Sequence, residues 1–198
     1  MNQHIKAFVH LVSILLVSPV LILYYLNKIV LKGDSFSGFS QFLSLIPGKI
    51  GSYCRIAFYR FTMTSCHYNC LIGFGTLFSQ PDTEIGQGVY IGPQCNIGSC
   101  RIESNCLIAS VVHIMSGNTQ HKFEDLDLPI QQQGGAYQKI LIGEDSWIGN
   151  GALVMASVGK KCVIGAGSVV TREVPDYSIM VGNPAKKIKS RMAPSYEL

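Results

Sequence analysis

The sequence of 198 residues predicts an all-β solenoid, a parallel β-helix that follows a hydrophobic N-terminal helix. Three observations predict it. From about residue 66 onward, aliphatic residues recur at a spacing of six, and most of them precede Gly or another small residue. One polar stretch, residues 116–139, interrupts this repeat. Near the N-terminus, the twenty residues 7–26 carry no formal charge.

The composition indicates one domain with a core of ordinary size. Charged residues make up 14% and hydrophobic residues 47% of the chain, and the formal net charge is +4. The 16 Lys and Arg residues form no dense runs, which argues against a nucleic-acid partner. The seven Cys residues match no zinc-binding spacing. The sequence has no cleavable-looking signal and is too long to need disulfides, so we expect reduced thiols and a cytosolic catalytic part.

The uncharged segment predicts a membrane anchor within residues 1–32. Its length matches the thickness of a bilayer core, and Tyr24 and Tyr25 stand where an interfacial belt would place them. The basic residues that follow it are Lys28, Lys32, Lys49, Arg55 and Arg60, whereas Lys6 precedes it. This asymmetry predicts that the rest of the chain lies on the cytoplasmic face of the membrane. The alternative is a helix buried in a soluble protein or packed in an oligomer.

The repeat is read from four series of aliphatic residues with a spacing of six. They are Ile85, Ile91 and Ile97; Ile102, Ile108 and Ile114; Ile142, Ile148 and Val154; and Val158, Ile164 and Val170. A helix repeats every 3.6 residues and a strand every two, so neither explains this period. In a β-helix, each unit supplies one short strand and one turn, and three units close a triangular coil. Shortened steps, such as the one from Val154 to Val158, predict locally tightened coils.

The residue two positions before each aliphatic residue also points into the coil, because side chains alternate along a strand, and it must be small. Five Cys residues occupy this position: Cys70, Cys95, Cys100, Cys106 and Cys162. We therefore interpret these thiols as core fillers and not as metal ligands or nucleophiles.

The interruption separates Ile114 from Ile142 and predicts a loop that projects from one corner of the solenoid. Loops of this length without regular structure are often functional. This loop contains His121, and a neutral imidazole, with an ordinary pKa of about 6.5, can remove a proton from a hydroxyl nucleophile. His121 is therefore the candidate general base, and we expect it near the root of the loop.

Four stretches carry a resemblance to a known family: "SGNTQH", "IGEDSWIGNGALVM", "VIGAGSVVTREVPDY" and "VGNPAKKIKS". With the interrupted repeat, they make roughly residues 66–191 similar to the hexapeptide-repeat acyltransferases, which have a left-handed β-helix. The branch resembled contains sugar, xenobiotic and surface-polysaccharide O-acetyltransferases. The resemblance implies a homotrimer, active sites between neighbouring β-helices, acetyl-CoA as donor and a sugar hydroxyl as acceptor.

The resemblance also implies roles for individual residues. His121 matches the catalytic base, although many relatives have His-x-His here and this chain has Thr119 at the first position. Asn118 and His113 are candidates for binding the acceptor. The candidates for binding acetyl-CoA are Trp147, Gly149, Asn150, Ala166, Gly167, Thr171, Arg172, Lys186 and Lys189. Trp147 precedes an inward Ile, so it should point outward and need cover from a neighbouring subunit.

These observations divide the chain into an anchor at 1–32, a helical or irregular connecting segment at 33–65, the β-helix at 66–175 and a C-terminal extension at 176–198 that includes a short helix. The expected function is acetyl-CoA-dependent O-acetyl transfer to a sugar or polysaccharide precursor, without a metal. One alternative is a non-enzymatic β-helix scaffold at a membrane. Another is a γ-class carbonic anhydrase, whose three His ligands the eight-residue spacing of His113 and His121 does not match.

Overall fold

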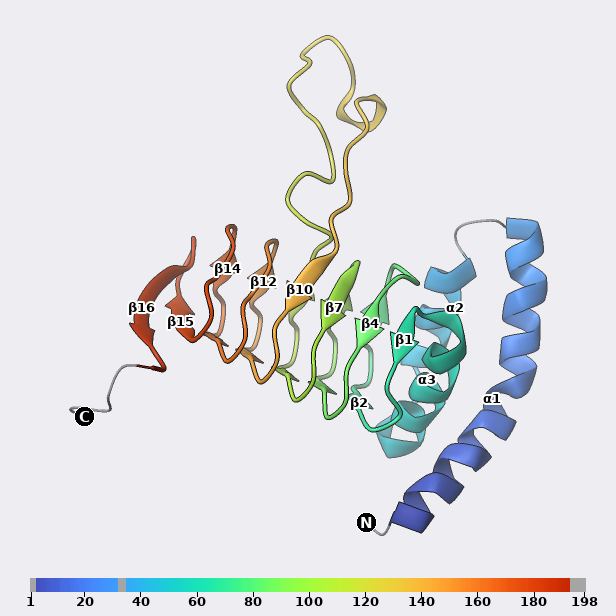
Figure 1. Cartoon of the computed structure of the whole chain (residues 1–198). Helices are drawn as coiled ribbons and strands as arrows, with labels where there is room; N and C mark the ends of the chain where they lie inside the picture. The colour runs from blue at the N-terminus through green and yellow to red at the C-terminus, as the bar shows by residue number, and fades with distance from the viewer. Residues whose placement is uncertain (1–2, 32–34, 193–198) are drawn as a thin grey trace.

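The computed structural model describes residues 3–31 and 35–192. Three helices come first: α1 (Gln3–Leu31), α2 (Ser35–Ser44) and α3 (Gly48–Thr62). A parallel β-helix of about six coils follows, and it extends away from the helices to the C-terminal end (Figure 1). The predicted solenoid with an N-terminal apolar helix is therefore confirmed.

The strands form three sheets, one on each side of the triangular coil. Sheet A contains β1 (Ser65–Cys66), β4 (Glu84–Ile85), β7 (Cys100–Ile102) and β10 (Ile140–Ile142). Sheet B contains β2 (Leu71–Ile72), β5 (Tyr90–Ile91), β8 (Leu107–Ile108), β11 (Trp147–Ile148), β13 (Val163–Ile164), β15 (Ser178–Val181) and β16 (Lys186–Ser190). Sheet C contains β3 (Leu77–Phe78), β6 (Asn96–Ile97), β9 (His113–Ile114), β12 (Leu153–Val154) and β14 (Val169–Val170).

The aliphatic residues of the repeat stack in register from coil to coil. In sheet B, Ile72 pairs with Ile91, Ile91 with Ile108, and the stack continues through Ile148 to Ile164. All five side chains are fully buried. Val158, which follows the shortened step of the repeat, still occupies a position in sheet A, because it forms single parallel bridges to Ile142 and Val174. The six-residue period therefore reports the stacking of one aliphatic residue per strand.

The Cys residues of the repeat lie among these stacks. Cys95, Cys100, Cys106 and Cys162 are buried, and Cys70 is half-buried. Burial raises the pKa of the thiols of Cys95, Cys100, Cys106 and Cys162, which keeps them protonated at neutral pH. Cys95, Cys106 and Cys162 also donate their S–H groups to backbone carbonyl groups of the next coil, so these thiols serve as small core side chains.

The C-terminal extension differs from the predicted short helix, which was wrong. Within the described residues, β15 continues sheet B beside β13, and β16 turns back to pair with β15 in antiparallel fashion. Gly182 at the turn has a φ of 97°, a left-handed conformation that Gly adopts without strain, and Pro184 follows. This turn breaks a helix, while the open edge of β15 supplies partners for a strand. Residues 193–198 of the predicted extension lie outside the described residues.

Helices α2 and α3 cover the open end of the first coil. Ser52 of α3 accepts a hydrogen bond from the Ile72 N–H (3.1 Å), and Ser40 of α2 accepts one from the Phe78 N–H (2.8 Å). Because these two strands have no preceding coil, side chains of the helices satisfy backbone groups that a further coil would otherwise bond.

Arg55 of α3 joins the two helices to the β-helix. Its guanidinium is completely buried and donates to the carbonyl of Ile72 (2.9 and 3.2 Å) and to those of Leu43 (3.1 Å) and Ile46 (2.8 Å) at the end of α2. Burial lowers the pKa of this side chain, but a guanidinium stays charged at neutral pH. The carbonyl groups therefore replace water around a buried charge.

We predict that Arg55→Met destabilises the protein by about 3–5 kcal/mol, because it leaves several buried carbonyl groups without donors. Chemical denaturation monitored by circular dichroism measures this change. Arg60→Met is the matched control, since Arg60 is exposed and lies on the same helix; it should cost less than about 1 kcal/mol. Equal effects of the two substitutions would contradict the role given to Arg55.

Candidate active site

The projecting loop leaves sheet C after β9 and returns to the solenoid at β10 in sheet A (Figure 1). Its two arms form a short antiparallel ladder. Gln138 N–H donates to Ser116 O (2.9 Å), Ala136 N–H to Thr119 O (2.8 Å) and Lys122 N–H to Gly134 O (2.9 Å). A Cβ at Gly135 would lie 1.8 Å from Gln120 O on the opposite arm. The arms can approach this closely only because Gly135 has no side chain.

His121 lies in this ladder, between the rungs of Thr119 and Lys122. Its side chain is exposed and makes no hydrogen bond or ion pair with any residue that the structure describes. Its backbone is held on both sides while its imidazole remains available to a substrate. Asn118 is also exposed, one residue before the Thr119 rung.

The outer part of the loop contains a 3-10 turn, η1 (Ile130–Gln132). Gln133 ties the acidic segment to this turn, because its side-chain amide donates to Asp125 O (2.7 Å) and Leu128 O (2.8 Å). Leu126, between these two carbonyl groups, is 95% exposed. The loop therefore presents apolar side chains outward from a hydrogen-bonded frame.

The root of the loop is fixed to sheet A by Lys139. Its ammonium donates to Glu84 Oε1 (2.6 Å) and to Asp82 O. The hydrogen bond from Lys139 holds the pKa of Glu84 below its ordinary value, against a smaller opposing effect of desolvation. At the other arm, Ser116 Oγ accepts from Ser99 N–H (2.8 Å). Sequence reasoning did not identify Lys139 or Glu84, since their contact joins residues far apart in the chain.

His113 lies in a cavity of about 250 Å³ at the root of the loop, on the outer face of sheet C. It is exposed, and on neighbouring strands it pairs in register with Asn96 and Leu153. Gln120, the residue before His121, also lines this cavity. The cavity thus links His113 to the inner part of the loop. Asn96 and Gln120 were missed from sequence, although counting coils would have placed Asn96 beside His113.

Part of the predicted donor site is brought together at the corner between sheets B and C. Gly167 N–H donates to Asn150 O (2.8 Å), and a Cβ at Gly149 would lie 2.6 Å from the nitrogen of Ala166. The turn before Lys186 reaches the same corner, where Ala185 N–H donates to Val169 O (2.8 Å). Asn150, Ala166 and Gly167 are exposed at this corner, whereas Gly149 is buried beneath the next coil.

Other residues predicted to bind the donor lie elsewhere in the chain. Thr171 and Arg172 follow β14 at the corner between sheets C and A, the corner from which the loop departs. Lys189 pairs with Ile179 at the end of sheet B. Trp147 is 51% exposed on the outer face of sheet B. A single chain therefore distributes these residues over sheet B and the two corners of sheet C and does not gather them into one cleft.

Sheet B carries an outward apolar row beside Trp147. Leu71, Tyr90, Leu107 and Trp147 pair in register on neighbouring strands, and all four are exposed.

Among the described residues, no three His, Cys, Asp or Glu side chains are grouped as a metal site would require.

No protein-family model matches the chain. It is 35% identical over 126 residues to a chloramphenicol acetyltransferase of Klebsiella aerogenes, a match that covers 56% of this chain and 55% of the relative. The chain spans about half of the length, or less, of the curated relatives it matches.

Solved structures show the same fold. A maltose O-acetyltransferase from Clostridium difficile 630 matches with a TM-score of 0.71 and 22% identity, over 82% of this chain and 88% of that one. A galactoside acetyltransferase in complex with coenzyme A matches with a TM-score of 0.59 and 20% identity, over 78% of each chain. The neighbours have left-handed β-helices. The repeats, the fold and the similarity to acetyltransferases fit the hexapeptide-repeat acyltransferase family.

The contact between Lys139 and Glu84 predicts a pH dependence of stability. The pKa of Glu84 is lower in the folded state than in the unfolded state. The ionised carboxylate therefore stabilises the folded protein above the unfolded pKa of about 4.3, and this stabilisation is lost as the pH falls through the pKa of the folded state. Glu84→Gln should lower the free energy of unfolding by less than about 1 kcal/mol near pH 6, because the pair is partly exposed.

Thermal unfolding at several pH values measures the difference between wild type and Glu84→Gln. The two proteins should converge at acidic pH, where the carboxyl of the wild type is also neutral. A difference that stays constant down to pH values below the folded pKa would contradict this interpretation. Glu173→Gln, at another exposed carboxylate of the solenoid, is the matched control.

Proposed function

We propose that this protein is an acetyl-CoA-dependent O-acetyltransferase that acetylates a hydroxyl of a sugar or polysaccharide precursor, with His121 as the general base. The observation that carries the proposal is the loop between β9 and β10, which holds an exposed imidazole on a braced backbone at the middle of the β-helix. The acetyltransferase names of the relatives and the coenzyme A in a structure of the same fold support the donor.

The chemistry follows from an imidazole that no other side chain or backbone group of the described residues engages. The neutral ring removes the proton of the acceptor hydroxyl as the hydroxyl oxygen attacks the thioester carbonyl. The resulting tetrahedral species expels the thiolate of coenzyme A as its C–S bond breaks. The imidazolium then returns its proton to the thiolate, so the ring ends the cycle neutral.

The donor is assigned to the corner formed by Gly149, Asn150, Ala166 and Gly167, where the absence of large side chains lets a linear molecule approach the backbone. Lys186 and Lys189 supply positive charge for its phosphates, with Thr171 and Arg172 on the far side of sheet C. His113 and Asn118 are assigned to the acceptor, because the His113 cavity adjoins the inner part of the loop.

The proposal includes a homotrimer with active sites between subunits. Its support is the distribution of the assigned residues around sheet C together with the exposed apolar row that ends at Trp147. A neighbouring copy would cover this row and close an open surface into a groove. The proposal also includes association with the cytoplasmic face of a membrane through α1, whose segment Phe8–Val30 is, among the described residues, long and apolar enough to cross a bilayer.

A direct test incubates the purified protein with acetyl-CoA and a panel of hydroxylated acceptors, from simple glycosides to polysaccharide fragments and chloramphenicol. Free thiol release and mass spectrometry of the acceptor measure transfer. We expect one acceptor class to gain an acetyl group. If no acceptor is acetylated and acetyl-CoA does not raise the melting temperature, the enzyme proposal is overturned in favour of a scaffold.

His121→Ala should lower kcat/KM by about 10²–10⁴-fold, because a general base contributes that much to such a transfer. The melting-temperature shift produced by acetyl-CoA should remain, since the base is assigned to the acceptor and not to the donor. His67→Ala is the matched control at a His in the first coil. A variant with His121→Ala that keeps the wild-type rate would remove His121 from the mechanism.

Lys186→Ala and Lys189→Ala should each raise the KM for acetyl-CoA about three- to tenfold with little change in kcat, because they remove uniform binding of the phosphates. With S-acetyl-N-acetylcysteamine, a donor without phosphates, the variants and wild type should be equal. Lys160→Ala, at an exposed Lys elsewhere on the solenoid, serves as the control. A penalty that persists with the short donor would show that the substitutions act through the fold.

A further inference from the structure

Helix α1 has the reverse of the polarity expected for a helix on a protein in water. Uncharged polar side chains in the body of the helix face the protein: His10 is 8% exposed and lies edge-on to the rings of Tyr53 and Tyr68, and Ser13 is buried. Asn27 is half-buried and accepts a hydrogen bond from Ser35 (3.0 Å). In water, the opposite arrangement would be stable.

The outward face of α1 is apolar from Phe8 to Val30. Its exposed side chains are Phe8, Leu11, Val12, Leu15, Leu16, Ile22, Leu23, Leu26, Ile29 and Val30. These residues recur at helical spacing on one broad face, whereas Val17 and Tyr24 on the opposite face are buried against the protein. At 1.5 Å per residue this face is about 35 Å long, and a continuous exposed apolar surface of this kind marks an interaction site.

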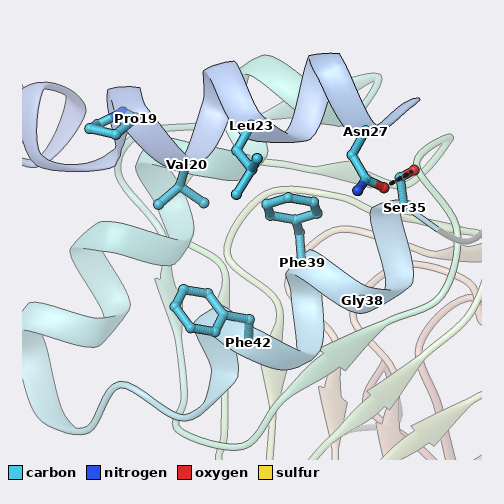
Figure 2. A pocket seen from close by; sticks show the side chains of 8 residues that line it. All are labelled: Pro19, Val20, Leu23, Asn27, Ser35, Gly38, Phe39 and Phe42. Carbon is cyan, nitrogen blue, oxygen red and sulfur yellow. Dashed lines mark hydrogen bonds between the residues drawn. The ribbon is translucent and has the colours of Figure 1, made fainter. Parts of the chain in front are cut away.

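Apolar clefts flank α1 on both sides. A cavity of about 540 Å³ lies between α1 and α2, lined by Val20 and Leu23 and by the rings of Phe39 and Phe42, with the Asn27–Ser35 hydrogen bond at one end (Figure 2). A second cavity, of about 460 Å³, is lined by α1 residues on its other flank, including Leu21 and Ile29. Both are open and nearly free of polar groups, so a hydrocarbon chain can enter them from outside.

We propose that α1 lies in the plane of a lipid bilayer surface, with its apolar face among the acyl chains, and that it does not cross the membrane. The outward face of α1 is suited to hydrocarbon, whereas its opposite face packs on the protein. An interfacial helix has the same one-sided distribution of apolar residues. The partners of α1 exclude a crossing, because α1 packs on α3 and α2, which expose Lys49, Arg60 and Gln41. A crossing helix would carry these groups into the hydrocarbon, where they are costly.

Lipid headgroups are the expected neighbours of the exposed Lys residues. Lys28 lies in the last turn of α1, and Lys49 lies in α3 beside the exposed Ile50. Ammonium groups next to an immersed apolar face favour anionic lipids. This inference deepens the membrane association in the proposed function and does not depend on acetyl transfer.

The test uses the full chain with a protease site and a tag at each end, added to preformed vesicles of phosphatidylcholine with a minor fraction of phosphatidylglycerol. We expect the protein to float with the vesicles, and protease added outside should cleave both sites. This readout needs no substitution. Cleavage of the C-terminal site with protection of the N-terminal one would show a crossing helix and overturn the proposal.

The double variant Leu15→Glu with Ile22→Glu should lower the vesicle partition coefficient at least tenfold, because it places two carboxylates on the immersed face. Leu126→Glu, at the exposed loop, should float like wild type. If wild type does not float and the double variant instead changes the oligomeric state, a second copy covers α1 and the proposal fails. His121→Ala should float normally, which separates this test from that of catalysis.

Discussion

The structure depends on how the open end of the β-helix is closed. Each coil bonds its backbone to the next, so the first coil has unpaired groups on one side. Here Ser40, Ser52 and Arg55 supply side-chain partners for Phe78 and Ile72, and Arg55 also binds the end of α2. A cationic side chain with several donors can satisfy carbonyl groups from two elements at once, which a further strand could not do. The same contacts fix α2 and α3, and through them α1, relative to every coil that follows.

A closed end allows the solenoid to be interrupted in its middle. After Ile114 the chain leaves for the loop, and it resumes with Ile142 in register with Ile102 as if no residues intervened. The ladder of the two arms and the contact of Lys139 with Glu84 bring the departing and returning chains back to the same corner. Local hydrogen bonds order the loop, and the aliphatic stacks of the solenoid continue past it without a break. His121 can therefore occupy a polar, exposed position without weakening the core.

The sequence predicted what depends on period and residue size. The stacks of Ile residues, the buried Cys residues and the position of the loop all follow from the six-residue repeat, because one strand geometry recurs in every coil. Arg55 was missed and was counted only as a charge flanking a membrane segment, since its partners are carbonyl groups that no side-chain pattern reveals. The C-terminal hairpin was mistaken for a helix because the basic residues there have no strong strand period. For α1, hydropathy identified an apolar segment, but its reversed polarity depends on which face packs on α3. The placement of the site residues between subunits stays a prediction.

The position of α1 at one end of the solenoid limits the acceptor. With α1 in the membrane plane, the coils extend away from the bilayer, and the loop projects sideways from the middle of the solenoid (Figure 1). Helix layers are spaced by about 8–10 Å and coils by about 4.8 Å. Since α3 and three coils lie between α1 and the loop, His121 stands roughly 30 Å from the membrane surface by these spacings. A hydroxyl close to the bilayer is then out of reach, whereas a hydroxyl carried on an extended glycan, anchored or free, can meet the imidazole. With the proposed base and the proposed orientation of α1, the outer sugars of a long precursor are better placed as acceptors than the headgroup of an ordinary lipid.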